Sequence, residues 1–169
     1  KVIMTDPDIN RPSLRVATAA ETLDLHDDDI VVVVQGDEPL VHPDMIDLAV
    51  QPLLDDKEIF VSNLCTNLSE KERLDPGEIK VVCDLKMNAI YMSRSPIPST
   101  DHEEKKAAWW KQVCIMPFRW HFMKKFNREL KPTPLELQES IEMIRAIQYG
   151  YKVRMVPSPY ISKSVDTEI

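Results

Sequence analysis

The stretch that decides the fold is Ile30-Val31-Val32-Val33-Val34-Gln35-Gly36-Asp37-Glu38-Pro39-Leu40. Its run of β-branched residues is typical of a strand buried on both faces, as in the parallel part of an α/β sheet. Gly36 lets the backbone turn sharply after the strand. Asp37 then follows the strand's carboxyl end, where open α/β sheets bind ligands. Two interpretations stay open: a carboxylate placed to hold a metal ion, and a solvated polar turn.

Strand and helix patterns alternate on both sides of this stretch. Strands are expected at residues 2–4, 30–34, 59–64, 79–84, 89–93, 113–118 and 152–156, with 79–84 and 89–93 as an antiparallel pair. Helices are expected at residues 14–23, 43–54 and 134–149. This alternation predicts a single domain over residues 1–169 with an α/β fold, in which helices flank a mixed, mainly parallel sheet.

Helix signals are clearest around residues 134–149. Thr133 and Glu136 form a capping box, Pro134 suits the first helical position, and Gly150 provides a stop. The expected buried stripe consists of Leu137, Ile141, Ile144 and Ile147. In the strand at 113–118, Pro117 favours a strand end or a sheet edge.

Composition narrows the class of protein. The chain has 169 residues, of which 43% are hydrophobic and 29% charged, as in an ordinary globular domain. The net charge of −7 argues against binding to a nucleic-acid polymer, and no apolar run approaches the ~20 residues needed to cross a bilayer. The cysteines, at positions 65, 83 and 114, are expected to be reduced thiols in a cytoplasmic protein. A strand pattern begins at once without an initiator Met, so we expect an N-terminally truncated chain.

Few other side chains suggest chemistry. Asp166 lies in a turn at residues 164–167, where it could cap a helix or, together with Asp37, hold one magnesium ion. Arg94 follows a strand beside a rigid Pro-containing turn; it is either surface charge or a fork that grips a carboxylate or phosphate. Glu139 and Glu142 lie off the apolar stripe, facing solvent or a cleft. Lys80 is expected to be surface charge.

Five segments, in order, resemble motifs of the CMP-Kdo synthetase (3-deoxy-manno-octulosonate cytidylyltransferase) family. Residues 33–40 resemble VQGDEP, 79–84 the VKVVLD strand, 89–98 ALYFSRAPIP, 132–145 PSPLE…EQLR, and 164–168 GVDTPE. The resemblance covers nearly the whole chain. It implies a nucleotidyltransferase fold related to GT-A glycosyltransferases, incomplete here at the N-terminus. It also implies transfer of CMP from CTP to the anomeric hydroxyl of a 3-deoxy-keto-sugar acid, Kdo or a relative, with release of pyrophosphate.

The resemblance further implies roles for single residues. Asp37 and Asp166 match the family's catalytic, magnesium-binding aspartates. The sugar pocket would be formed by Gln35, Gly36, Arg94, Gln112 and Glu142, and the nucleotide side by Ser13 and Arg15. The implied protein is a cytoplasmic homodimer of lipopolysaccharide biosynthesis whose partners are CTP and an acidic sugar.

Departures from the family motifs carry expectations too. SGT-[DE]-R is replaced by residues 11–15, RPSLR, which removes a Gly next to the nucleotide. At residues 112–116 the chain has QVCIM where the family has HLGIY, so a His on the sugar side is missing. At residues 142–145 it has EMIR where the family has EQLR, so a Gln is missing. Missing polar groups favour a different sugar acid, because such groups strongly decide specificity.

The family's basic triphosphate loop has no counterpart, so the chain is expected to be inactive or nearly so. Two alternatives stay open: a GT-A-type glycosyltransferase, although Asp37-Glu38-Pro39 is not a DxD motif, and a non-catalytic paralogue used for binding or assembly.

Overall fold

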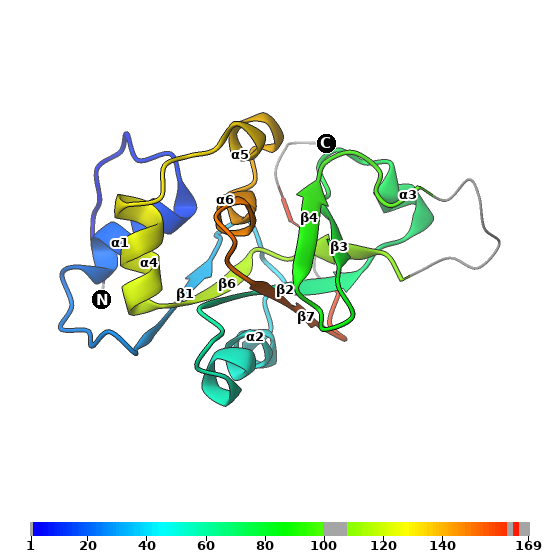
Figure 1. Cartoon of the computed structure of the whole chain (residues 1–169). Coiled ribbons are helices and arrows are strands. Elements are labelled where there is room, and N and C mark those ends of the chain that lie inside the picture. The colour runs from blue at the N-terminus through cyan, green and yellow to red at the C-terminus, as the bar shows by residue number, and fades with distance from the viewer. Residues whose placement is uncertain (1, 100–107, 162–163, 166–169) are drawn as a thin grey trace.

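Helices and strands alternate along the chain in the computed structural model, which describes residues 2–99, 108–161 and 164–165 (Figure 1). The helices are α1 Pro12–Ala20, α2 Pro43–Asp55, α3 Glu70–Arg73, α4 Trp120–Arg128, α5 Pro134–Glu139 and α6 Met143–Gln148. The strands are β1 Ile30–Val34, β2 Val61–Asn67, β3 Lys80–Cys83, β4 Ala89–Ser93, β5 Trp110–Gln112, β6 Ile115–Arg119 and β7 Val153–Pro157.

The strands form a 7-stranded sheet in the order β1-β6-β2-β5-β3-β4, and β7 pairs with β2 beside this path. Among the described strands only β2 and β7 run parallel, from Val61 opposite Val153 to Cys65 opposite Pro157. The other pairs are antiparallel, including the β3–β4 hairpin that the sequence predicted. The α/β class is therefore confirmed, whereas the expectation of a mainly parallel sheet is wrong.

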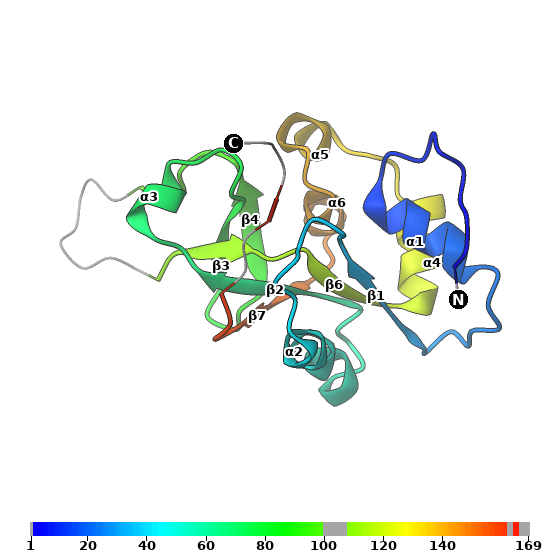
Figure 2. The same cartoon turned by 180° about the vertical axis from the view of Figure 1, so that it is seen from behind.

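The error comes from the apolar run in β1. This strand lies at one end of the sheet, where it pairs antiparallel with β6. Its residues are apolar because helices cover both of its faces: α2 contacts it from one side of the sheet, and α1 and α4 contact it from the other (Figures 1 and 2). A run of β-branched residues thus reports that both faces of a strand are covered, and it does not report the direction of the neighbouring strand.

Two apolar clusters lie on opposite faces of the sheet. The smaller one joins Met45 and Ala49 of α2 to Leu64 and Ile115. The larger one contains residues of α1, α4 and α6, among them Ala17, Phe122, Phe126 and Ile144. The cartoon shows α2 on one side of the sheet and α1, α4 and α6 on the other, in both views (Figures 1 and 2).

The segment expected to be one helix at residues 134–149 is two helices. Ser140 adopts the left-handed conformation, with φ 55° and ψ 46°, and ends α5. The capping box of Thr133 and Glu136 is confirmed, and Gly150, with φ 81°, ends α6 as predicted. Leu137, which was expected in the buried stripe, is 57% exposed, and Glu136 is the buried residue of α5.

Pro117 lies in the middle of β6, opposite Val32, and not at a strand end or sheet edge. The amide of Gln35 donates to the carbonyl of Cys114, so these two residues form a hydrogen-bonded pair between the chain segments of β1 and β6. Because hydrogen-bonded and non-hydrogen-bonded pairs alternate along antiparallel strands, the nitrogen of Pro117 points away from β1. On that side β6 pairs with β2 only at Phe118, so the ladder between these two strands stops where the proline has no N–H to donate.

Two further expectations concern the ends of the chain. Residues 2–4 form no strand, and among residues 164–167 only Ser164 and Val165 are described, neither of them in a helix. Within the described ranges, no helix combines the length and apolar character that a membrane span requires.

Candidate functional site

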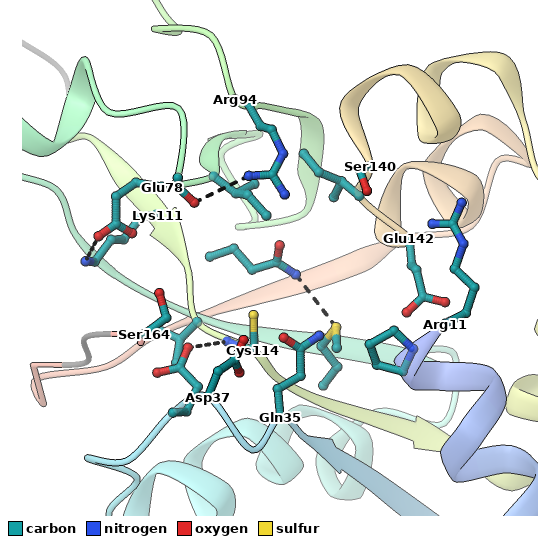
Figure 3. A pocket seen from close by; sticks show the side chains of 18 of the residues that line it. Arg11, Gln35, Asp37, Glu78, Arg94, Lys111, Cys114, Ser140, Glu142 and Ser164 are labelled. Carbon is teal, nitrogen blue, oxygen red and sulfur yellow. Dashed lines mark hydrogen bonds and ion pairs between the residues drawn. The ribbon is translucent and has the colours of Figure 1, made fainter. Parts of the chain in front are cut away.

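A cavity of about 480 Å³ opens beside the turn that follows β1 (Figure 3). Its walls come from the start of α1, the turns before β3 and after β4, the segment from β5 to β6, and the corner between α5 and α6. Polar residues line it from these elements, among them Arg11, Gln35, Asp37, Arg94, Gln112 and Glu142. Segments far apart in the sequence therefore meet at one polar site.

Gln35, Asp37, Arg94, Gln112 and Glu142 were all assigned to the site from sequence, and all line this cavity. Asp166 lies outside the described residues. The described residues directly before it reach the site, because Ser164 lines the cavity and the amide of Val165 donates to the carbonyl of Asp37 at 2.9 Å.

Gly36 lies between two lining residues without lining the cavity itself. Its φ is not left-handed, and a Cβ added there would have no atom within 4 Å. The turn after β1 therefore does not require the conformational freedom of glycine at this position, contrary to the expectation from sequence.

Ser13 and Arg15, expected on the nucleotide side, do not line the cavity. Ser13 is fully buried; its hydroxyl donates to Oε1 of Glu142 at 2.5 Å and to Asn127 at 3.0 Å, and its amide donates to Oε2 of Glu142 at 3.2 Å. Arg15 donates to the hydroxyl of Thr5 at 2.6 Å and to carbonyls of the segment before α1. Ser13 thus fixes a cavity residue from behind, and Arg15 holds the segment before α1.

Arg94 reaches the cavity from the turn after β4, and Glu139 holds it. The amide of Arg94 donates to Oε2 of Glu139 at 2.9 Å, and its Nε donates to the carbonyl of Glu139 at 2.9 Å. Oε1 of Glu139 accepts from the hydroxyls of Ser93 at 2.7 Å and Tyr91 at 3.2 Å. Burial acts to raise the pKa of Glu139, but these hydrogen bonds together outweigh burial, and the pKa is lowered.

Two buried lysines shape the same wall, and neither was predicted there. Lys80, expected at the surface, is fully buried, and its Nζ donates to the carbonyls of Asp75, Glu78 and Arg94. Lys111 lines the cavity, and its Nζ lies 2.8 Å from Glu72 and 2.9 Å from Glu78. Burial acts to lower the pKa of Lys111, yet the hydrogen bonds to both carboxylates outweigh this effect and raise it. No spacing in the sequence signals either contact.

Arg11 is a further lining residue that the sequence did not identify. Its Nη1 lies 3.7 Å from Oε1 of Glu136, a fully buried carboxylate that also binds Arg145. Nε of Arg145 donates to Oε2 of Glu136 at 2.7 Å. The buried Glu136–Arg145 pair thus fixes the helix corner at the rim of the cavity and anchors Arg11 beside it.

The donor set at Asp37 fits a hard divalent cation. The carboxylate of Asp37 lies at the cavity wall with its Oδ1 buried, whereas neighbouring Glu38 is buried and accepts from the amide of Cys114 at 3.2 Å. In the described part of the chain no group of three or more His, Cys, Asp or Glu side chains could hold a metal ion. A magnesium ion there would therefore complete its shell with substrate oxygens and water, as is usual for this ion.

Comparisons with known proteins agree on one family. A family model described as cytidylyltransferase matches residues 1–154. The 3-deoxy-manno-octulosonate cytidylyltransferase of Syntrophus aciditrophicus is 36% identical over 168 residues, which cover 99% of this chain and 67% of that protein. The enzyme of the same name from Francisella philomiragia is 37% identical, covering 94% of this chain and 65% of that protein. The chain thus spans about two thirds of the length of these curated relatives.

Solved structures point the same way. A structure of CMP:2-keto-3-deoxy-manno-octonic acid synthetase complexed with CTP matches with a TM-score of 0.87 and 31% identity, covering 98% of this chain and 66% of the other. A putative glucose-1-phosphate thymidylyltransferase from Bacillus anthracis matches with a TM-score of 0.54 and 13% identity, covering 94% of this chain and 56% of the other. The second likeness concerns the fold alone.

Proposed function

Because the chain belongs to the cytidylyltransferase family, we propose that it transfers CMP from CTP to an acidic sugar of the 3-deoxy-manno-octulosonate type. The observation that carries the proposal is the cavity in which Asp37 and Arg94 face a common space from opposite walls (Figure 3). A carboxylate suited to a metal ion and a guanidinium suited to an acid are the two charges that a triphosphate and a sugar acid require.

In the proposed reaction the anomeric oxygen of the sugar forms a bond to the α-phosphorus of CTP. The bond between that phosphorus and the bridge to the β-phosphate breaks, pyrophosphate leaves with the electron pair, and the hydroxyl proton passes to solvent or base. Such transfers depend on positioning and on charge stabilisation more than on covalent help from the protein.

We assign Asp37, together with Asp166, to a magnesium ion, whose charge would offset that of the phosphates. Arg94 is assigned to the sugar carboxylate, because its planar fork matches that group. Gln35, Gln112 and Glu142 offer hydrogen bonds to the sugar hydroxyls from the other walls. Each role follows from a side chain that lines the cavity, apart from that of Asp166.

The identity of the sugar depends most on Gln112. The family's Gln in EQLR corresponds to Met143, but Met143 is fully buried and lines no part of the cavity, so this replacement does not change the cavity wall. Gln112, at the position of the family's His, does line the cavity. A relative of Kdo is therefore the substrate that we propose.

Family membership also supports three wider proposals: a homodimer, a cytoplasmic location and a place in lipopolysaccharide precursor synthesis. Light scattering of the purified protein tests the first of these directly, because a dimer doubles the scattering mass.

The decisive experiment measures pyrophosphate release from CTP and magnesium with Kdo, with related 3-deoxy-keto acids, and with neutral mannose as a control. It is carried out with this chain and with any longer form of the protein. Release that requires an acidic sugar supports the proposal. Transfer of an intact sugar from a nucleotide-sugar would instead identify a glycosyltransferase. Absence of CTP binding by the longer form, measured by calorimetry, would identify a non-catalytic paralogue.

A further inference from the structure

We propose that Glu139 is a positioning residue that aims the guanidinium of Arg94 into the cavity, and that it sets the affinity for the acidic substrate separately from that for the nucleotide. The inference rests on the proposed function for its kinetic consequence, but its structural part can be tested without turnover. Glu139 itself does not line the cavity, whereas Arg94 does.

Glu139 holds both ends of Arg94. Its carboxylate accepts the backbone amide at 2.9 Å, and its carbonyl accepts Nε at 2.9 Å. The carbonyl is available because Glu139 is the last residue of α5, and the last carbonyls of a helix have no partner within it. The left-handed Ser140 ends the helix at this point. One residue therefore orients the main chain and the side chain of Arg94 together.

The carboxylate of Glu139 is itself held from β4. Ser93 and Tyr91 donate to Oε1, while Arg94 donates to Oε2. These donors stabilise the ionised form, because hydrogen bonds to a carboxylate are stronger when it is charged. Glu139 thus remains a charged acceptor with a fixed orientation well into the acidic range.

The opposite side of the guanidinium is fixed by a second group of carbonyls. Nη1 of Arg94 donates to the carbonyl of Pro76 at 3.0 Å. The turn that carries this carbonyl is anchored by Lys80, whose Nζ donates to Asp75 at 2.7 Å and to Glu78 at 2.8 Å. The guanidinium is therefore held between α5 and a rigid turn.

Within the described ranges, every hydrogen bond of this guanidinium goes to a main-chain carbonyl, and no ion pair joins it to a carboxylate. The carbonyls fix its direction without forming an ion pair, although the nearby carboxylate of Glu139 interacts with its charge. An arginine that is oriented in advance and keeps its charge binds an anion with less loss of side-chain entropy. Glu139 therefore affects the affinity for the anion that Arg94 binds, and not the affinity for groups that bind elsewhere in the cavity.

The test is Glu139→Gln, which keeps the shape of the side chain. It replaces one carboxylate oxygen, a hydrogen-bond acceptor, by an NH2 group, which would face the N–H or O–H donors that now bind that oxygen. We expect the KM for the acidic sugar to rise about tenfold, the effect of losing one charged hydrogen bond, while kcat and the KM for CTP stay within about twofold. Tyr91→Phe, which removes one of the donors, should give a smaller rise of the same kind. Glu129→Gln, the same change at an exposed residue, should leave all constants unchanged.

A structural readout keeps the inference separate from the proposed function. In the wild-type chain the amide proton of Arg94 should shift, by nuclear magnetic resonance, as Glu139 titrates below the ordinary glutamate range of 4.5. In Glu139→Gln this titration should vanish, and the Nε proton of Arg94 should exchange faster with water.

If the wild type shows this titration but a longer form of the protein releases no pyrophosphate, the proposed function fails and the positioning role stands. If Glu139→Gln leaves the Arg94 signals unchanged, or raises both KM values in parallel, the positioning role is overturned.

Discussion

The hydroxyl of Ser13 lies 2.5 Å from Oε1 of Glu142, and the amide of Ser13 donates to the other carboxylate oxygen at 3.2 Å. These bonds join the first turn of α1 to the residue that precedes α6. They also place a carboxylate at a helix N-terminus, where the helix dipole favours negative charge. One wall of the cavity therefore depends on a single buried serine.

Ser13→Ala should lower the free energy of unfolding by about 1 to 2 kcal/mol, because it leaves acceptors on Glu142 and Asn127 without their donor. Urea denaturation measures this loss. Thr18→Ala, which removes a hydroxyl from a more exposed position of the same helix, should change stability by less than about 0.5 kcal/mol. Equal effects of the two substitutions would contradict the importance of the Ser13–Glu142 contact.

Asp37→Asn should lower turnover by at least about a hundredfold, since a metal-stabilised transition state depends on several kcal/mol of charge stabilisation. Magnesium affinity, measured by calorimetry in the presence of CTP, should fall in parallel. Thermal stability should stay close to that of the wild type, and Asp47→Asn on the exposed side of α2 should change neither quantity. Wild-type turnover in Asp37→Asn would reject this residue as a metal ligand.

Acid should weaken the fold through Glu72. Burial raises the pKa of Glu72, but hydrogen bonds from Lys111 and Ser69 outweigh burial and lower it from 4.5 to about 2. A depressed pKa stabilises the fold above the unfolded value, so this contribution is complete above about pH 4.5 and is lost as the pH falls towards 2. The side chain is 32% exposed, so after allowing for solvent screening we expect roughly 1 kcal/mol.

Urea midpoints measured from pH 6 to pH 2 test this expectation. Glu72→Gln should make the acid-induced loss of stability shallower, and Glu58→Gln at an exposed position should not. Glu139, whose pKa is also lowered, should keep part of the slope in both variants. Identical slopes in wild type and Glu72→Gln would show that the contact with Lys111 adds no stability.

The same glycine substitution should have different effects at two positions. Gly150→Ala should cost about 1 kcal/mol of stability, because φ at Gly150 is 81°, where a Cβ is strained. Gly36→Ala should change stability by less than about 0.5 kcal/mol, because its φ is not left-handed and no atom lies within 4 Å of the added Cβ. Thermal melts of the two variants measure the difference; comparable losses would disprove the distinction.

Local signals in the sequence predicted the local structure. The strand before Asp37, the β3–β4 hairpin, the cap at Thr133 and the stop at Gly150 all follow from residues close together in the chain. Asp37 also lines the cavity as expected, although the strand-end rule behind that expectation assumes a parallel sheet and β1 pairs antiparallel. These features depend on short-range propensity, which a single sequence displays.

What the sequence did not reveal depends on distant partners. Ser140 carries no breaker signal such as Pro or Gly, and its left-handed conformation lies between Glu139, which binds Arg94, and Glu142, which binds Ser13. Lys80 is buried because three carbonyls surround its amine. The direction of a strand relative to its neighbour also depends on which distant segment it pairs with. The local sequence of β1 does not reveal this, so β1 was wrongly expected to lie in a parallel sheet.

The central strand β2 pairs with β5, β6 and β7, all of which come later in the chain. During synthesis the apolar segment Val61–Asn67 therefore leaves the ribosome long before its last partner, Val153–Pro157. Until that strand emerges, β2 presents an open edge to other nascent chains, which is a hazard for aggregation. Arrested chains of increasing length should become protease-resistant only after β7 has cleared the exit tunnel, which makes the last strand the step that commits the newborn protein to its fold.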